Sequence, residues 1–278
     1  MRRRQFLTTL TLAAVPGGVS AQPAAPAKPP QDPTKQAPTV TPKAVMVIDV
    51  MTGQILFQKN AREKRAVAST QKLLTALLLC EAGKLDRLST AAAYDEAAEP
   101  TKIYLKPGAE YPRREILKAM LMKSANDCAR CLARTHAGSE DAFAVLMNKR
   151  AELLGMVDSH FVNASGLPGD QHSTARDMAL LARAAYLQPV IRSIVCQAES
   201  TFTHADGRVV KLHNTNHLLT SDPYCNGMKT GYTDAAGKCL ICSAAYKGRT
   251  VIAVLLGGTS AKIWTEGKAL LHWALGVP

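Results

Sequence analysis

The sequence predicts a mixed α/β fold of the α+β type, in which an antiparallel β-sheet built from both chain ends stands beside a helical lobe. Strand-like apolar runs begin near residue 44 and return after residue 194, whereas helical periodicity dominates the residues between them. Because strands and helices are segregated along the chain, the strands are expected to pair antiparallel within one sheet. A binding or catalytic site would then lie where the sheet meets the helices.

The N-terminal residues have the three parts of a secretory signal peptide: a basic start, a modestly apolar stretch and small residues up to Ala21. Cleavage is expected after Ala21, and the pair Arg3-Arg4 resembles a twin-arginine export signal. Residues 22–42 contain seven prolines among alanines, lysines and glutamines, which is typical of an extended linker. Residues 43–278 form the predicted folded domain. We therefore expect an exported protein, periplasmic or otherwise extracytoplasmic.

The net charge of +12 favours an anionic partner. The basic residues are scattered singly, aromatic residues are few and no nucleic-acid-binding motif is present, so nucleic acid is not expected as a partner. An anionic envelope surface suits an exported protein better. The final segment, residues 262–275, has the pattern of an amphipathic helix packed on the domain, and no stable membrane anchor is expected.

Seven cysteines, an odd number, leave at least one thiol unpaired. Cys128 with Cys131 and Cys239 with Cys242 have the spacing of a split zinc site. The second pair, however, lies in a strand pattern, where residues three apart point to opposite faces. Packed, buried thiols are therefore expected. The seven histidines show no metal-ligand spacing, so we expect neither metal nor cofactor, and an activity insensitive to chelators.

The individual elements follow from local patterns. Two apolar runs about the turn at Thr52-Gly53 predict an N-terminal β-hairpin, and residues 81–111 are rich in loop signals. Helices are predicted at 113–122, 127–136, 140–154 and 175–186, with a loop at 161–169. Strands are predicted at 199–203, 209–213, 227–232, 239–246 and 250–257, followed by the closing helix.

The most informative stretch starts at Ser69 and is apolar almost all round until Gly83, as in a buried helix. Ser69 and Lys72 share a helix face. Lys72 is flanked by leucines without a carboxylate nearby in sequence, so desolvation should lower its pKa and let the neutral amine act as a base. The helix start would favour an oxyanion at Ser69. A serine at a helix start can also be a simple cap, so this motif alone does not decide the function.

Two further motifs follow in a defined order. Ser124-Ala125-Asn126 lies between two helical patterns, and Lys229-Thr230-Gly231 opens the apolar part of a strand. Each motif is common by itself. Together with Ser69-x-x-Lys72 they form the set found in penicillin-binding proteins and class A β-lactamases.

On these motifs the sequence resembles the low-molecular-mass penicillin-binding proteins, the serine D-alanyl-D-alanine carboxypeptidases of the S11 peptidase type. The resemblance covers residues 44–275 and implies a penicillin-binding protein/β-lactamase-like fold. It also includes Thr52-Gly53, Lys106-Pro107-Gly108, Phe161-Val162-Asn163, residues 172–179 and Asn214-Thr215-Asn216.

The resemblance implies a role for each motif residue. Ser69 would attack the carbonyl between two D-alanines and become acylated, with Lys72 taking its proton. Ser124 would relay a proton to the leaving amine, and Asn126 would hold the substrate amide and orient Lys72. The substrates would be peptidoglycan stem peptides, and β-lactams would act as covalent inhibitors.

The strand motif would bind the substrate. Lys229 and Thr230 would hold the terminal carboxylate, and Gly231 would keep the strand edge open for the peptide. The backbone N–H groups of Ser69 and Tyr232 would form the oxyanion hole.

Other functions stay open at this stage. Short relatives of this type include D,D-endopeptidases, which cut cross-links, and residues 214–218 and 235–240 resemble those equally well. A non-catalytic module that binds cell-wall peptide is a second alternative. β-Lactamase activity is not expected, because Ala125 replaces the aspartate of class A enzymes and no deacylating glutamate loop is found. The β-rich domain and membrane-binding tail that follow the catalytic domain in many members are not expected here.

Overall fold

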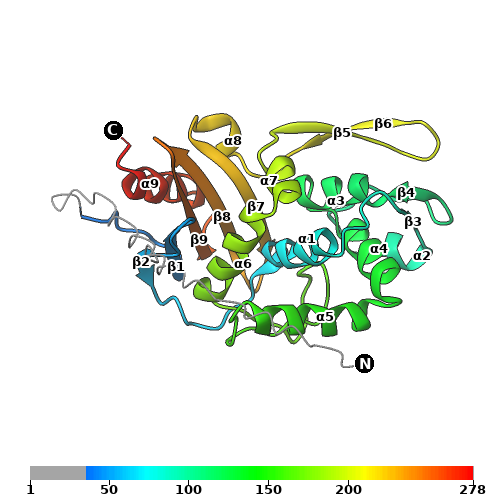
Figure 1. The fold of residues 1–278 in the computed structure, drawn as a ribbon, viewed down its shortest axis with the longest axis horizontal. Coiled ribbons are helices and arrows are strands. Elements are labelled where there is room, and N and C mark those ends of the chain that lie inside the picture. The colour runs from blue at the N-terminus through cyan, green and yellow to red at the C-terminus, as the bar shows by residue number, and fades with distance from the viewer. Residues whose placement is uncertain (1–35, 278) are drawn as a thin grey trace, which may run out of the picture. The chain divides into compact units, whose positions relative to one another are not determined.

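The computed structural model describes residues 36–277 (Figure 1). The predicted signal peptide and the first part of the predicted linker lie outside the described residues. Among the described residues, no single helix combines the length and the hydropathy needed to cross a bilayer. Helices α6 (Ala175–Leu187) and α7 (Pro189–Val195) meet that criterion only when taken together, and they are bent by 98° at their junction.

The predicted sheet from both chain ends is confirmed. Within residues 36–277 the main sheet has five antiparallel strands in the order β2-β1-β9-β8-β7. The ends of the chain are joined where Ala44 of β1 faces Leu256 of β9. The strands are β1 (Ala44–Asp49), β2 (Ile55–Lys59), β7 (Cys225–Thr233), β8 (Gly237–Tyr246) and β9 (Arg249–Gly258). Because β7 is an edge strand, one of its sides is left for other contacts.

The sheet is the middle layer between two sets of helices (Figure 1). Strands β8 and β9 are almost continuously apolar and buried, as expected of strands covered on both faces. Alternate residues such as Ile241 and Ile252 belong to the core shared with the helical lobe, whereas Leu240 and Val251 pack with helix α9 (Ile263–Leu275). Cys239 and Cys242 fall in these two different cores, so they point to opposite faces as predicted.

The helical lobe surrounds α1 (Lys72–Glu81), whose residues are buried on nearly every side. Side-chain caps start two of the surrounding helices: Ser139 accepts from the Ala142 amide, and Thr174 accepts from the Asp177 amide. The other helices are α3 (Arg113–Met122), α4 (Asn126–Ala137), α5 (Glu140–Leu153), α6 (Ala175–Leu187), α7 (Pro189–Val195) and the short α2 (Ala93–Glu96) and α8 (Leu218–Ser221). The four helices predicted in this region are therefore confirmed to within about two residues.

The predicted start of the first helix was wrong. The α-helix begins at Lys72, and Ser69 lies in the 3₁₀ turn η1 (Ala68–Gln71) that precedes it. Both the amide and the hydroxyl of Thr70 donate to the Val67 carbonyl, which closes the tighter turn. Ser69 therefore stands in a distinct turn with its own backbone geometry.

Two further predictions of secondary structure need correction. Strands β5 (Glu199–Thr203) and β6 (Val209–His213) form a separate ribbon instead of joining the main sheet. The ribbon extends beside α3 (Figure 1), with Phe202 packed against Tyr111 at 5.6 Å between ring centroids. The loop-rich region 81–111 contains β3 (Leu88–Thr90), α2 and β4 (Glu110–Pro112), and α7 was not predicted. These elements are too short for a periodic signal.

Candidate active site

A cleft of about 650 Å³ lies between the edge strand β7 and the helical lobe. It brings together six of the predicted site residues, which come from three separate parts of the chain: Ser69, Ser124, Asn126, Thr230, Gly231 and Tyr232. Lys72 and Lys229 are buried beside it, 0% and 1% exposed. The cleft is also lined by Pro100, Thr101, Gly166, Leu167, Thr215, His217, Thr233, Lys238, Cys239, Ser260, Ile263 and Trp264.

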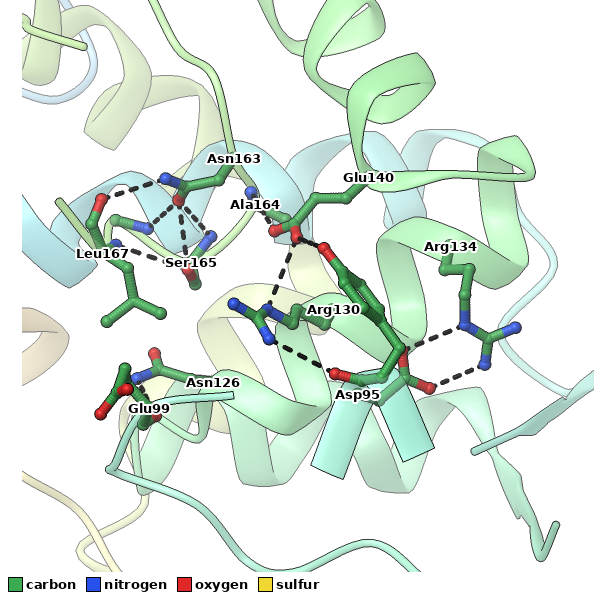
Figure 2. Close-up of polar contacts among 12 residues, drawn as sticks. Asp95, Glu99, Asn126, Arg130, Arg134, Glu140, Asn163, Ala164, Ser165 and Leu167 are labelled. Atoms are coloured by element: carbon green, nitrogen blue, oxygen red, sulfur yellow. Dashed lines mark hydrogen bonds and ion pairs between the residues drawn. The ribbon is translucent and has the colours of Figure 1, made fainter. Parts of the chain in front are cut away.

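The Lys72 amine has three oxygen neighbours from three elements. Its Nζ lies 2.9 Å from Ser69 Oγ and 2.7 Å from Asn126 Oδ1, and it also donates to the Ser165 carbonyl. The Asn126 side chain is oriented by a second bond, because its Nδ2 donates to the Glu99 carbonyl at 2.8 Å (Figure 2). The amide oxygen of Asn126 is thereby directed at the amine.

Burial lowers the pKa of Lys72 well below its usual value, and the neighbouring Lys229 lowers it further. The buried carboxylates Asp127 and Glu140 act in the opposite direction without reversing the shift. The direction agrees with the expectation from the leucine-flanked sequence. A neutral amine 2.9 Å from a serine hydroxyl can accept its proton.

Two glycines permit the close packing around Ser69. Gly166 has φ +82°, and a Cβ there would lie 2.1 Å from the Ala68 carbonyl oxygen. A Cβ on Gly231 would lie 2.9 Å from the Ser69 backbone nitrogen. Gly231 therefore lets β7 approach the Ser69 turn itself, which is a tighter requirement than an open strand edge for substrate.

The loop 163–167 is the part of the site to which sequence reasoning assigned no role. Its carbonyl at Ser165 binds Lys72, and its shape is held from within by Asn163, whose Oδ1 accepts from the Ser165 and Gly166 amides at 3.1 and 2.8 Å (Figure 2). An asparagine followed within three residues by serine and glycine is a recognisable turn signal. The partner of that turn, Lys72, could be found only in three dimensions.

The serine of the middle motif has unusual backbone geometry. Ser124 joins α3 to α4 with φ +65°, a left-handed conformation that is uncommon outside glycine. The next residues begin α4, and the Asn126 amide donates to the Thr101 carbonyl at 2.7 Å. Asp127 is fully buried and accepts from the Leu105 amide at 3.0 Å. These bonds tie residues 101–105, of which Thr101 lines the cleft, to the start of α4 next to Ser124.

The β7 motif places a second buried lysine at the cleft. Lys229 Nζ donates to the Thr230 carbonyl at 2.9 Å, and burial lowers its pKa to about 7. The Thr230 hydroxyl lies 2.6 Å from the hydroxyl of Thr215. Tyr232 follows on the strand with 55% exposure, and the Lys238 ammonium lies 4.4 Å from the centroid of its ring. This end of the cleft is therefore cationic and carries hydroxyl groups.

Within the described residues, no group of three or more histidine, cysteine or acidic side chains is arranged to hold a metal ion. The cysteines are all free thiols there, and four of them are buried: Cys128, Cys131, Cys239 and Cys242.

The sheet enclosed by helices, with the Ser69-Lys72 pair facing an S-x-N loop and a K-T-G edge strand, defines the penicillin-binding protein fold of the D,D-peptidases. The sequence model of the D-alanyl-D-alanine carboxypeptidase family, peptidase S11, matches residues 31–260. The chain belongs to this family.

Known relatives agree with this assignment. The chain is 34% identical over 226 residues to D-alanyl-D-alanine carboxypeptidase DacF of Bacillus subtilis, covering 79% of this chain and 58% of the relative. It is 34% identical over 255 residues to DacC of Escherichia coli, covering 86% and 62%. The chain thus spans about three fifths of the length of these relatives. A crystal structure of a D-alanyl-D-alanine carboxypeptidase from Mycobacterium tuberculosis superposes with a TM-score of 0.84 at 30% identity, covering 89% and 96%.

Proposed function

We propose that residues 43–278 are the catalytic domain of a serine D-alanyl-D-alanine carboxypeptidase, which removes the terminal D-alanine from peptidoglycan stem peptides through an acyl-enzyme on Ser69. The observation that carries the proposal is the position of the buried Lys72 amine, 2.9 Å from Ser69 Oγ and bonded to two fixed acceptors. Family membership supports the same reaction.

In the acylation step Lys72 is the general base. A neutral amine has two N–H donors and one lone pair. The donors are used by Asn126 Oδ1 and the Ser165 carbonyl, so the lone pair faces the Ser69 hydroxyl. As Ser69 Oγ bonds to the carbonyl carbon of the penultimate D-alanine, its proton moves to Lys72. The backbone N–H groups of Ser69 and Tyr232 are proposed to stabilise the oxyanion.

The leaving group must then gain a proton. Ser124 faces the same cleft and is proposed to relay the proton from Lys72 to the amine of the terminal D-alanine as the C–N bond breaks. Free D-alanine departs and the shortened peptide remains as an ester on Ser69. Water, deprotonated by Lys72, attacks the ester carbonyl and restores the Ser69 hydroxyl.

Recognition of the terminal carboxylate is assigned to the β7 motif. Lys229 supplies a positive charge and Thr230 a hydroxyl group, which is paired with the Thr215 hydroxyl. Because burial lowers the pKa of Lys229 to about 7, an arriving carboxylate favours its protonated form. A β-lactam, which also carries a carboxylate and a reactive carbonyl, is expected to acylate Ser69 and to leave slowly.

The location follows from the substrate. Peptidoglycan lies outside the cytoplasm, and the signal-peptide pattern of residues 1–21 fits export to that compartment. We therefore place the enzyme in the extracytoplasmic space, with residues 22–42 as a linker to the catalytic domain.

Release of free D-alanine from a soluble pentapeptide ending in D-Ala-D-Ala tests the proposal, with Ser69→Ala as the control. We expect release by the wild type and a loss of at least ~10³-fold in the variant, because the nucleophile is gone. Full activity of Ser69→Ala would contradict the mechanism.

A cross-linked peptide dimer should be tested in parallel. Cleavage of the dimer without release from the pentapeptide would identify an endopeptidase. If the wild type and Ser69→Ala both bind peptidoglycan and the wild type forms no acyl adduct, the chain is a non-catalytic binding module.

A further inference from the structure

Glu140 is a buried carboxylate that lies outside the cleft lining and has no part in the mechanism above. It is the first residue of α5 and is 8% exposed. Its Oε1 accepts from the Ala164 amide at 3.1 Å, and its Oε2 accepts from the Tyr94 hydroxyl at 2.9 Å. The same Oε2 lies 3.6 Å from Arg130 Nε, forming an ion pair (Figure 2). The two carboxylate oxygens therefore join a loop to two other elements.

Both backbone groups of Ala164 are hydrogen-bonded to side chains. Its amide donates to Glu140, and its carbonyl accepts from the Thr75 hydroxyl at 2.7 Å, one turn after Lys72 on α1. The next residue is Ser165, whose carbonyl binds the Lys72 amine. A displacement of the Ala164 peptide would therefore move an acceptor of Lys72.

The other carboxylate oxygen of Glu140 contacts the helix that carries Asn126, the second acceptor of the Lys72 amine. Arg130 lies four residues after Asn126 on α4, so the two side chains share one helix face. Arg130 is held in place by the Tyr94 ring, 4.9 Å from its guanidinium carbon, and Figure 2 shows Asn126 and Arg130 along the same helix. Glu140 thus connects the helix that presents Asn126 with the loop that presents Ser165.

We propose that Glu140 is a positioning residue, whose carboxylate sets the spacing of Asn126 Oδ1 and the Ser165 carbonyl and so holds the Lys72 amine against Ser69. The proposal rests on the proposed function, in which Lys72 is the base. Its physical basis is that a shared carboxylate fixes both acceptors at once, and that misplacing a base by 1 Å costs a large part of its efficiency.

The negative charge of Glu140 gives the proposal a measurable effect on pH dependence, which a purely structural role of Glu140 would not produce. The charged or titratable groups acting on Lys72 are Lys229 from β7, Asp127 and Cys128 from α4, and Glu140 from α5. Glu140 is itself contacted by Tyr94 and Arg130. Because the Glu140 carboxylate raises the pKa of Lys72, its neutralisation lowers that pKa further. More of the neutral amine is then present at acid pH.

The experiment compares Glu140→Gln with Asp141→Asn, which makes the same charge change at the exposed neighbour on α5. For Glu140→Gln we expect kcat for D-alanine release to fall about tenfold with KM little changed, and the acid limb of the pH profile to move to lower pH. Asp141→Asn should leave both unchanged. A fall in kcat with the limb in its wild-type position would overturn the proposal, and so would a wild-type kcat.

A second measurement separates this inference from the proposed function. In Glu140→Ala, and to a smaller extent in Tyr94→Phe, hydrogen exchange at the Ala164 amide should be faster than in the wild type, about tenfold or more for Glu140→Ala. If the wild type releases no D-alanine, the proposed function fails, while faster exchange still supports the anchoring of the loop. Unchanged exchange in both variants would overturn the anchoring, whatever the activity. Tyr94→Phe keeps the test valid should Glu140→Ala not fold.

Discussion

Lys72 and Lys229 are two fully buried lysines of one cleft, and their surroundings differ. Both have a lowered pKa, for which burial is the main cause. Lys72 is surrounded by Ser69 Oγ, Asn126 Oδ1 and the Ser165 carbonyl, all supplied by the protein. Among residues 36–277, the side chain of Lys229 hydrogen-bonds only to the Thr230 carbonyl of its own strand.

This difference underlies the two separate roles proposed for the lysines in a single site. In the proposed mechanism Lys72 is a neutral amine that donates to Asn126 Oδ1 and the Ser165 carbonyl and keeps its lone pair for Ser69. Lys229 is proposed to keep its donors for a ligand, and its pKa of about 7 would let it become a cation when a carboxylate arrives. Burial is therefore common to the two lysines, and the oxygen atoms around each amine distinguish them.

The largest expected effect tests the assignment of the base. In Lys72→Ala we expect acylation of Ser69 by a labelled penicillin to slow by ~10³-fold, because among residues 36–277 the Ser69 hydroxyl hydrogen-bonds only to the Lys72 amine. Single-turnover acylation kinetics measure this. Binding of the penicillin before acylation should change little, since the proposed carboxylate site is formed by Lys229 and Thr230. If Lys72→Ala instead weakened binding and left the acylation rate unchanged, the roles proposed for Lys72 and Lys229 would have to be exchanged.

The next effect concerns Lys229 and pH. Its cationic form is present below a pKa of about 7 and lost above it, so kcat/KM for a peptide with a free C-terminal carboxylate should fall above that pH, by up to about tenfold per unit. Lys229→Ala should remove this limb and lower kcat/KM at pH 6 by ~10²-fold, through the loss of a buried charge pair.

The matched control is the same peptide with an amidated C-terminus. The amide carries no charge for Lys229 to bind, so its kcat/KM should lack the limb near pH 7. The same limb with both peptides would assign it to a group other than Lys229.

The smallest expected effect concerns the loop 163–167, which hydrogen-bonds to Lys72 and not to Lys229. Gly166→Ala and Gly207→Ala place a methyl group at nearly the same backbone angle, φ +82° and +84°. A Cβ at Gly166 would collide with the backbone of the Ser69 turn, whereas no atom lies within 4 Å of a Cβ at Gly207. Gly207→Ala should cost only the left-handed strain, about 1–2 kcal/mol of unfolding free energy. Gly166→Ala should cost more and should also slow acylation, because the Ser165 carbonyl moves away from Lys72.

Thermal unfolding and penicillin acylation of the two glycine variants measure this difference. Equal losses of stability, with acylation intact in both, would show that the contact between Gly166 and the Ser69 turn does not matter.

Local sequence determined most of the architecture, because its signals depend on neighbours in the chain. The hairpin at Thr52-Gly53, the helices beginning at Arg113 and Glu140, and the paired strands at the C-terminus follow from periodicity and turn residues. The same is true of the three motifs and of the lowered pKa of Lys72, which the surrounding leucines predict.

Only the tertiary structure decided what lies around those residues. Three contacts of the site join residues that are far apart in the sequence. The Ser165 carbonyl lies 93 residues from its partner Lys72, the Glu140 carboxylate 24 residues from Ala164, and the Thr215 hydroxyl 15 residues from Thr230. The ribbon β5-β6 lies outside the main sheet, where Phe202 packs on Tyr111, a contact between distant residues that strand propensity does not encode. The physical reason is common to these cases: a side chain's donors, acceptors and volume are local, whereas the partner that satisfies them is chosen by packing.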